Sequence, residues 1–250
     1  MYYLPYLTTH RPLVGGFNPI YSLHIFTTIT QRLKLVIYCY YTIAMFRKVG
    51  IAGDSFVSHL EAFIGVESQK DDSIIKENLG LDPDSVMITW HGVGGRTVRK
   101  FLEFDLPGIA DLNVEAVVMQ IGSNDLCDHD MTPEILLERV QLELLPHLHH
   151  KGIQVVMLCQ VLRRKSPPRS GLPLEIYNSR VDTFNKLLES TFSEHYLAHY
   201  WPHISIFSCG KVNRIWRHDG VHLNWQHGQK PFYRSVRGAA IKARDLLNNM

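Results

Sequence analysis

From residue 49 to its end, the chain alternates short apolar runs with longer amphipathic stretches, a pattern that few folds accommodate. Five runs of four to six residues are rich in Val and Ile and end near Gly or a polar residue, as buried parallel strands do. The predicted strands are Val49–Ala52, Ser85–Thr89, Ala116–Ile121, Gln154–Cys159 and His203–Phe207.

The stretches between these runs have helical periodicity. Thr132–His149 opens with Thr-Pro-Glu and stops before Gly152, as helices commonly do. Glu175–Glu194 spaces its apolar residues for one helical face, and Gly238–Asn249 closes the chain. Regular alternation of strand and helix predicts an α/β fold, a three-layer α/β/α sandwich with a central parallel sheet of about five strands. We expect residues 45–250 to form this one domain.

The first 44 residues differ in composition from the rest. Residues 1–48 contain no acidic side chain, and their apolar run, Leu35–Phe46, has 12 residues. A membrane-spanning helix needs about 20 residues, so no stable membrane span is expected. Met45 directly precedes the first predicted strand. Our hypothesis is that residues 1–44 are an accessory extension, or an upstream reading-frame artefact, outside the functional domain.

Charge and cysteine content narrow the class of protein. A formal net charge of +2 does not indicate nucleic-acid binding, so no nucleic-acid partner is expected. Residues 1–150 carry a net charge of −7 and residues 151–250 a net charge of +9. This split fits two oppositely charged surfaces, or an anionic ligand at one edge. The cysteines lack paired spacing, which favours a reducing, cytoplasmic compartment and leaves secretion open: Cys39, Cys127, Cys159 and Cys209.

Polar residues follow the first three predicted strands, where ligands bind in open parallel sheets. Gly53-Asp54-Ser55 places a serine at the start of a predicted helix, where free N–H groups favour negative charge; an ordinary helix cap has the same residues. His91-Gly-Val-Gly-Gly-Arg-Thr97 is a glycine turn without a dinucleotide or phosphate-loop pattern. Gly122-Ser-Asn-Asp125 offers an amide donor for an oxyanion, or an Asx turn.

A fourth motif, Asp219-Gly-Val-His222-Leu-Asn224, lies before the last predicted helix. A carboxylate three residues before a histidine can fix the tautomer of the imidazole and stabilise its protonated form. A surface Asp–His pair has the same spacing. The four motifs together, in this order along the chain, are much less expected by chance than any one of them.

These motifs resemble the four conserved blocks of the SGNH (GDSL-type) hydrolase superfamily, over roughly residues 47–247. The resemblance implies a flavodoxin-like fold and a serine esterase that cleaves short acyl or O-acetyl esters. Ser55 would be the nucleophile, His222 the general base and Asp219 the residue that orients it. The oxyanion hole would consist of the Ser55 and Gly95 backbone N–H groups and the Asn124 side chain. The resemblance implies no cofactor, and a small-molecule, carbohydrate or lipid ester as substrate.

The chain departs from the family pattern at two points. Phe56 stands where the family signature usually has Leu, a difference that concerns packing. Gly92, Gly94 and Gly95 compete for the second block, and Gly95 is preferred for its place before a predicted helix.

Other readings of the same residues remain open. His218, Asp219 and His222 could bind a metal in a metal-dependent hydrolase, although the sequence shows no further carboxylates to complete such a site. A catalytically silent binding module of the same fold is the main alternative function. Arg96 and the Arg163–Lys165 cluster could meet an anionic substrate group or form a solvated basic loop. Asp54 and Asp125 are expected to cap helices near the site.

Overall fold

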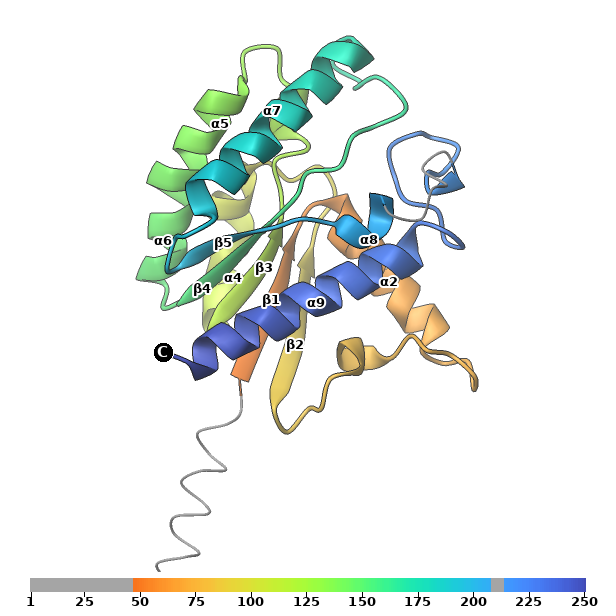
Figure 1. Ribbon diagram of the computed structural model, residues 1–250, viewed down its shortest axis with the longest axis vertical. Coiled ribbons are helices and arrows are strands. Elements are labelled where there is room, and N and C mark those ends of the chain that lie inside the picture. The colour runs from red at the N-terminus through yellow and green to blue at the C-terminus, as the bar shows by residue number, and fades with distance from the viewer. Residues whose placement is uncertain (1–46, 208–213) are drawn as a thin grey trace, which may run out of the picture. The chain divides into compact units, whose positions relative to one another are not determined.

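The computed structural model describes residues 47–207 and 214–250. Its centre is a five-stranded parallel sheet with the order β2-β1-β3-β4-β5 (Figure 1). Residues 1–44 and the apolar run Leu35–Phe46 lie outside the described residues, so the hypothesis about them stays a prediction. The strands are β1 (Arg47–Gly53), β2 (Val86–Gly92), β3 (Ala116–Gln120), β4 (Val155–Cys159) and β5 (Ala198–Trp201).

Helices cover both faces of the sheet, which confirms the predicted three-layer α/β fold (Figure 1). Alternate strand residues form two separate cores. Val49, Val118 and Met157 belong to the core with α2 (Ser55–Glu67) and α9 (Gln229–Asn248). Val117 and Val156 face the opposite core, which includes residues of three further helices: α4 (Leu106–Asp111), α5 (Pro133–Arg139) and α7 (Leu174–Phe192). The central strands β3 and β4 are largely apolar and buried along their whole length, as strands covered on both faces are.

The predicted helix over residues 132–149 forms, with one irregularity. Thr132 caps α5 by accepting the Ile135 N–H, and a π-helical turn, Val140–Leu144, links α5 to α6 (Leu145–His150). Pro146 has no backbone N–H to donate to the preceding turn, so the regular hydrogen-bond ladder is interrupted here. Short helical segments complete the elements: Glu77–Gly80, α3 (Val98–Lys100), Phe101–Asp105, Asp125–Cys127 and α8 (Ile204–Phe207).

The predicted fifth strand, His203–Phe207, is wrong. The strand lies earlier, at Ala198–Trp201, and Ile204–Phe207 is the short helix α8. Pro202 follows the strand and cannot donate to a sheet ladder. The His203 backbone N–H donates instead to Gln160 Oε1 (2.8 Å), and its buried ring bonds to Ser235 Oγ and Gln120 Oε1, both at 2.7 Å. Burial lowers the pKa of His203 to about 3.

The last helix is longer than predicted, because α9 begins at Gln229 and runs through Gly238. At Gly238 the Trp201 ring approaches the helix, and a Cβ there would lie 2.9 Å from Trp201 Cζ2. This glycine therefore serves close packing and does not mark a helix end.

Candidate active site

Ser55 lies at the carboxyl edge of the sheet, where β1 gives way to α2. Asp54 is the N-cap of α2, and its Oδ1 accepts the Phe56 N–H (3.0 Å). The Asp54 backbone N–H donates to Gln120 O (3.0 Å), which ties this turn to β3. Ser55 is the first residue of the helix, so its side chain lies where free N–H groups and the helix dipole favour negative charge.

Ser55 and His222, 167 residues apart in the chain, are in hydrogen-bond contact. Ser55 Oγ lies 3.0 Å from His222 Nε2, and His222 Nδ1 lies 2.9 Å from Asp219 Oδ2. Asp219 Oδ1 accepts the backbone N–H groups of Val221 and His222. Burial acts to raise the Asp219 pKa, but the bonds from His222 and Val221 outweigh it and hold the pKa well below its usual value. The ionised carboxylate orients an imidazole that can accept the Ser55 proton.

The turn that carries Asp219 and His222 is fixed by its neighbours. The Arg217 N–H donates to His222 O (2.7 Å), and Trp216 pairs with Leu223 in an isolated β-bridge. The Lys165 backbone N–H donates to Gly220 O (2.7 Å). The loop after β4 is therefore bonded to the turn that places His222.

His59 is a site residue that the sequence analysis missed. Its ring packs edge-to-face on His222, with the ring centroids 4.4 Å apart. Burial lowers the pKa of His59, and the nearby charges of His222 and Arg217 lower it further. A neutral ring therefore borders the imidazole. Its place one turn after Ser55 on the same helix face is the signal that could have found it.

The three candidate glycines in the turn after β2 have different surroundings. A Cβ at Gly92 would overlap the backbone of Ser58, so this glycine serves the packing of β2 on α2. Gly94 and Gly95 line the cleft that contains Ser55 and His222, and Gly95 has a positive φ of 74°. Glycine adopts this backbone conformation without strain.

Asn124 also lines this cleft. Its Nδ2 donates to Arg96 O (3.0 Å), directly after Gly95, and its Oδ1 lies 3.5 Å from Arg164 Nη2. An amide nitrogen has two hydrogens, so one remains for a ligand. The Arg96 guanidinium is not placed to bind a substrate anion, because it pairs with both carboxylate oxygens of Asp105.

The cleft has a volume of about 710 Å³ and is lined mainly by polar residues. Its lining consists of Ser55, Ser58, His59, Gly94, Gly95, Asn124, Cys127, Arg164, Ser166, Pro167, Arg169, Ser170, Asp219, Val221 and His222.

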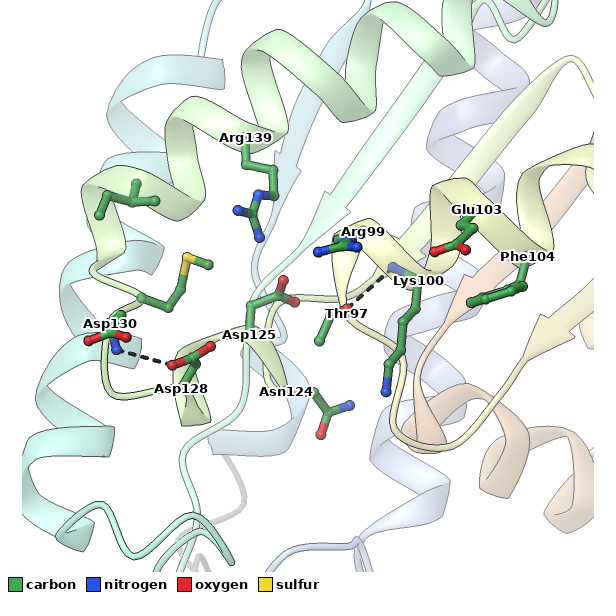
Figure 2. A pocket seen from close by; sticks show the side chains of 12 residues that line it. Thr97, Arg99, Lys100, Glu103, Phe104, Asn124, Asp125, Asp128, Asp130 and Arg139 are labelled. Carbon is green, nitrogen blue, oxygen red and sulfur yellow. Dashed lines mark hydrogen bonds between the residues drawn. The ribbon is translucent and has the colours of Figure 1, made fainter.

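A second pocket of about 570 Å³ shares Asn124 with this cleft (Figure 2). Figure 2 shows Asp125 directed toward Arg139, while the Asn124 side chain points away from Arg139. Both Asp125 carboxylate oxygens accept the Val98 N–H, and burial raises the pKa of Asp125 to about 6. Asp125 thus supports the chain after the glycine turn, in line with the expected capping role.

Asp54 provides a prediction about stability. Burial raises its pKa to about 7 from 3.8, despite the Phe56 N–H bond and the Arg164 charge. The folded chain holds this proton up to about pH 7, whereas the unfolded chain loses it near pH 3.8. Asp54 therefore contributes most stability below pH 3.8, and its contribution falls by roughly 1.4 kcal/mol per pH unit up to about pH 7.

Asp54→Asn keeps an oxygen to accept the Phe56 N–H but cannot ionise. We expect the free energy of unfolding of this variant, relative to the original chain, to rise by a few kcal/mol between pH 4.5 and pH 7. Urea denaturation at both pH values measures the difference. A difference between the two chains that does not change with pH would show that Asp54 titrates normally.

The metal-ligand alternative gains no support from the described side chains. Both ring nitrogens of His222 face protein groups, Ser55 and Asp219. Among residues 47–207 and 214–250, no cluster of three or more His, Cys, Asp or Glu side chains is placed to hold a metal ion.

Within the same ranges, no helix has the length and apolar character needed to cross a membrane.

Comparisons with known proteins identify the fold. No protein-family model matches the chain, and no curated protein sequence matches it. Solved structures do match. A lipase/acylhydrolase from Enterococcus faecalis is 16% identical, with a TM-score of 0.54 over 77% of this chain and 96% of that chain.

Two further structures agree with this match. A carbohydrate esterase family 3 protein from Talaromyces cellulolyticus is 14% identical, with a TM-score of 0.55 over 82% of this chain and 99% of that chain. A protein from Desulfitobacterium hafniense, described as lipolytic and of the G-D-S-L family, is 12% identical, with a TM-score of 0.52 over 76% and 98%. The resemblance to the SGNH (GDSL-type) hydrolase superfamily is confirmed at the level of the fold.

Proposed function

We propose that the chain is a serine esterase that hydrolyses short acyl or O-acetyl esters through an acyl-enzyme intermediate. One observation carries the proposal: the continuous hydrogen-bonded series from Ser55 Oγ through His222 to Asp219, at 3.0 and 2.9 Å. A serine, a base and a group that orients the base, within hydrogen-bond reach of one another, form the arrangement that activates a hydroxyl nucleophile. The esterase and acylhydrolase descriptions of proteins with this fold add support.

In the proposed mechanism, Ser55 Oγ attacks the ester carbonyl as His222 Nε2 accepts its proton. His222 then gives this proton to the leaving alkoxide, and the alcohol departs. Water, deprotonated by His222, attacks the acyl-enzyme and releases the acid and free Ser55. Asp219 stays ionised and stabilises the imidazolium in both steps.

The oxyanion of each tetrahedral intermediate would accept hydrogen bonds from three donors: the Ser55 N–H, the Gly95 N–H and the Asn124 side chain. Ser55 N is at a helix start, where backbone N–H groups are free. The Arg96 carbonyl holds Asn124 Nδ2 in place beside the glycine turn. Donors fixed before the reaction stabilise developing charge without having to reorganise.

The polar lining favours short acyl groups over long alkyl chains. Cys127, Pro167 and Val221 are the apolar side chains of the cleft, beside ten polar ones. A long acyl chain needs an extended apolar surface to be stabilised by burial. An acetyl or similarly small group makes no such demand.

Asn124→Ala tests the oxyanion hole. Loss of one such donor should lower kcat by about 10²–10³ and change KM little, because the interaction strengthens as charge develops. Steady-state hydrolysis of 4-nitrophenyl acetate measures both constants. Asn248→Ala is the matched control, since Asn248 bonds to Arg47 at the opposite end of β1. A loss below threefold would remove Asn124 from the hole.

The function itself is tested by incubating the full chain with 4-nitrophenyl acetate and butyrate, with and without EDTA. We expect saturable hydrolysis that EDTA leaves unchanged and that favours the acetate. A folded chain that hydrolyses neither ester would support a binding module of the same fold. Activity abolished by EDTA and restored by a divalent metal would support the metal-dependent alternative.

A further inference from the structure

The basic loop after β4 contains four cationic residues, and their surroundings differ. The Arg163 guanidinium pairs with both carboxylate oxygens of Asp182 on α7, including a 2.7 Å bond from Nε to Oδ1. Arg163 is exposed, and its charge is matched on the surface. Arg164 lines the cleft together with Ser55 and His222. The loop is therefore more than a uniformly solvated basic segment.

The backbone of Arg164 is fixed by Asn178 on α7. The Arg164 N–H donates to Asn178 Oδ1 (2.9 Å), and Asn178 Nδ2 donates to Arg164 O (3.0 Å). The backbone N–H of the next residue, Lys165, donates to the Gly220 carbonyl oxygen in the turn that carries His222. These three bonds hold the backbone of Arg164 at a set place relative to the base. A side chain positioned in this way loses little further freedom when it binds a ligand.

The guanidinium of Arg164 is held in the cleft by neutral groups. Its Nη2 donates to Ser123 Oγ (2.9 Å), and its Cζ lies 4.8 Å from the centroid of the Tyr177 ring. Among residues 47–207 and 214–250, no carboxylate forms an ion pair with Arg164. Asp54 lies near enough to feel its charge, but this carboxyl group is buried and bonds to Phe56 N–H.

The cleft around Arg164 has an excess of cationic groups. Arg169 also lines the cleft. The acidic side chain in the lining of the cleft is Asp219, which is hydrogen-bonded to His222. A guanidinium partly removed from water is stabilised strongly by an anion that reaches it, and its planar donors match a carboxylate or phosphate. The hydrogen bonds to Ser123 and Asn124 all come from Nη2, and the buried Nε has no partner in the described part of the chain, so the guanidinium keeps an unpaired donor beside such an anion.

We propose that Arg164 determines substrate specificity by binding an anionic group, such as a carboxylate, on the ester. This inference rests on the proposed esterase function and specifies its substrate class. The anionic group is distinct from the reacting carbonyl oxygen, which the oxyanion donors bind; it is a second group of the acyl or the alcohol part. Arg164 acts as the counter-charge that places this group while Ser55 attacks.

The test compares two matched pairs of esters with the full chain. Mono-4-nitrophenyl succinate and its methyl ester differ by one charge on the acyl side. 4-Acetoxybenzoate and its methyl ester differ in the same way on the alcohol side. The variants are Arg164→Met and Arg164→Lys, and Arg163→Met is the control from the same loop. We expect the original chain to prefer the charged member of one pair, which tells which side carries the anion.

Arg164→Met should lower kcat/KM for that charged ester roughly tenfold to a hundredfold more than for its neutral partner. Arg164→Lys should restore part of the preference, and Arg163→Met should keep all of it. Equal losses on charged and neutral esters would overturn the proposal and leave Arg164 as a positioning residue for Ser123 and Asn124. If the original chain hydrolyses no ester and takes no fluorophosphonate label, the esterase function fails, and this proposal fails with it.

Discussion

Ser55→Ala is expected to lower turnover of 4-nitrophenyl acetate by up to about 10⁶-fold, the loss seen when a serine hydrolase loses its nucleophile. The hydroxyl is the reacting group, so the remaining oxyanion donors and cleft can give only weak residual catalysis. The substitution removes one oxygen at the first residue of α2, and Asp54 still caps the helix. We therefore expect the fold to be retained, and kcat measured beside circular dichroism separates lost chemistry from lost structure.

Ser58→Ala is the matched control for this result. Ser58 lines the same cleft one turn later on α2, but its Oγ contacts the Ser55 carbonyl oxygen (3.2 Å) and not a histidine. We expect this variant to keep most of its activity. If Ser58→Ala abolishes hydrolysis and Ser55→Ala does not, the nucleophile is wrongly assigned.

Asp219→Asn is expected to lower kcat by about 10⁴-fold with little change in structure. The amide oxygen can still accept the Val221 and His222 backbone N–H groups that Asp219 Oδ1 now accepts. The amide nitrogen would face His222 Nδ1 and favour the tautomer whose Nε2 carries a proton. Such an imidazole cannot accept the Ser55 proton, and it also loses the charge that stabilises its protonated form.

The measurement for Asp219→Asn is kcat between pH 6 and 9 with a short acyl ester. Raising the pH should restore part of the activity, because hydroxide can replace the missing base. Asp245→Asn on α9, a surface carboxylate paired with Arg244, is the control and should match the original chain. A loss below tenfold for Asp219→Asn would mean that His222 does not depend on this carboxylate.

Four of the five strands could be predicted from the sequence because each is a short run rich in apolar residues that ends near Gly or a polar residue. The fifth could not, because Ala198–Trp201 is short and has His199 and Tyr200 in its middle. The apolar residues after Pro202 fit a strand equally well by composition. Pro202 and the buried bonds of His203 decide the outcome, and those bonds reach Gln120 on β3, Ser235 on α9 and Gln160 directly after β4.

The candidate site divides in a similar way. Ser55, Asn124 and His222 stand in local motifs directly after strands or before the last helix, so sequence order alone suggested that they meet. His59 and Arg164 have no such motif. Their roles in the site depend on contacts across the fold. His59 contacts the His222 ring, and Arg164 contacts Ser123 and Tyr177. The four-residue spacing from Ser55 places His59 on the same helix face, but spacing carries no information about the contacts of Arg164 with Ser123 and Tyr177.

Covalent labelling with a fluorophosphonate tests the central claim, an activated serine at position 55, most directly. The full chain, Ser55→Ala, His222→Ala and Ser58→Ala are each treated with the probe, and the labelled peptide is identified by mass spectrometry. We predict one label per chain, on Ser55, present in the original chain and Ser58→Ala and absent from the other two variants. A folded original chain without label, or with label on another residue, would contradict the account.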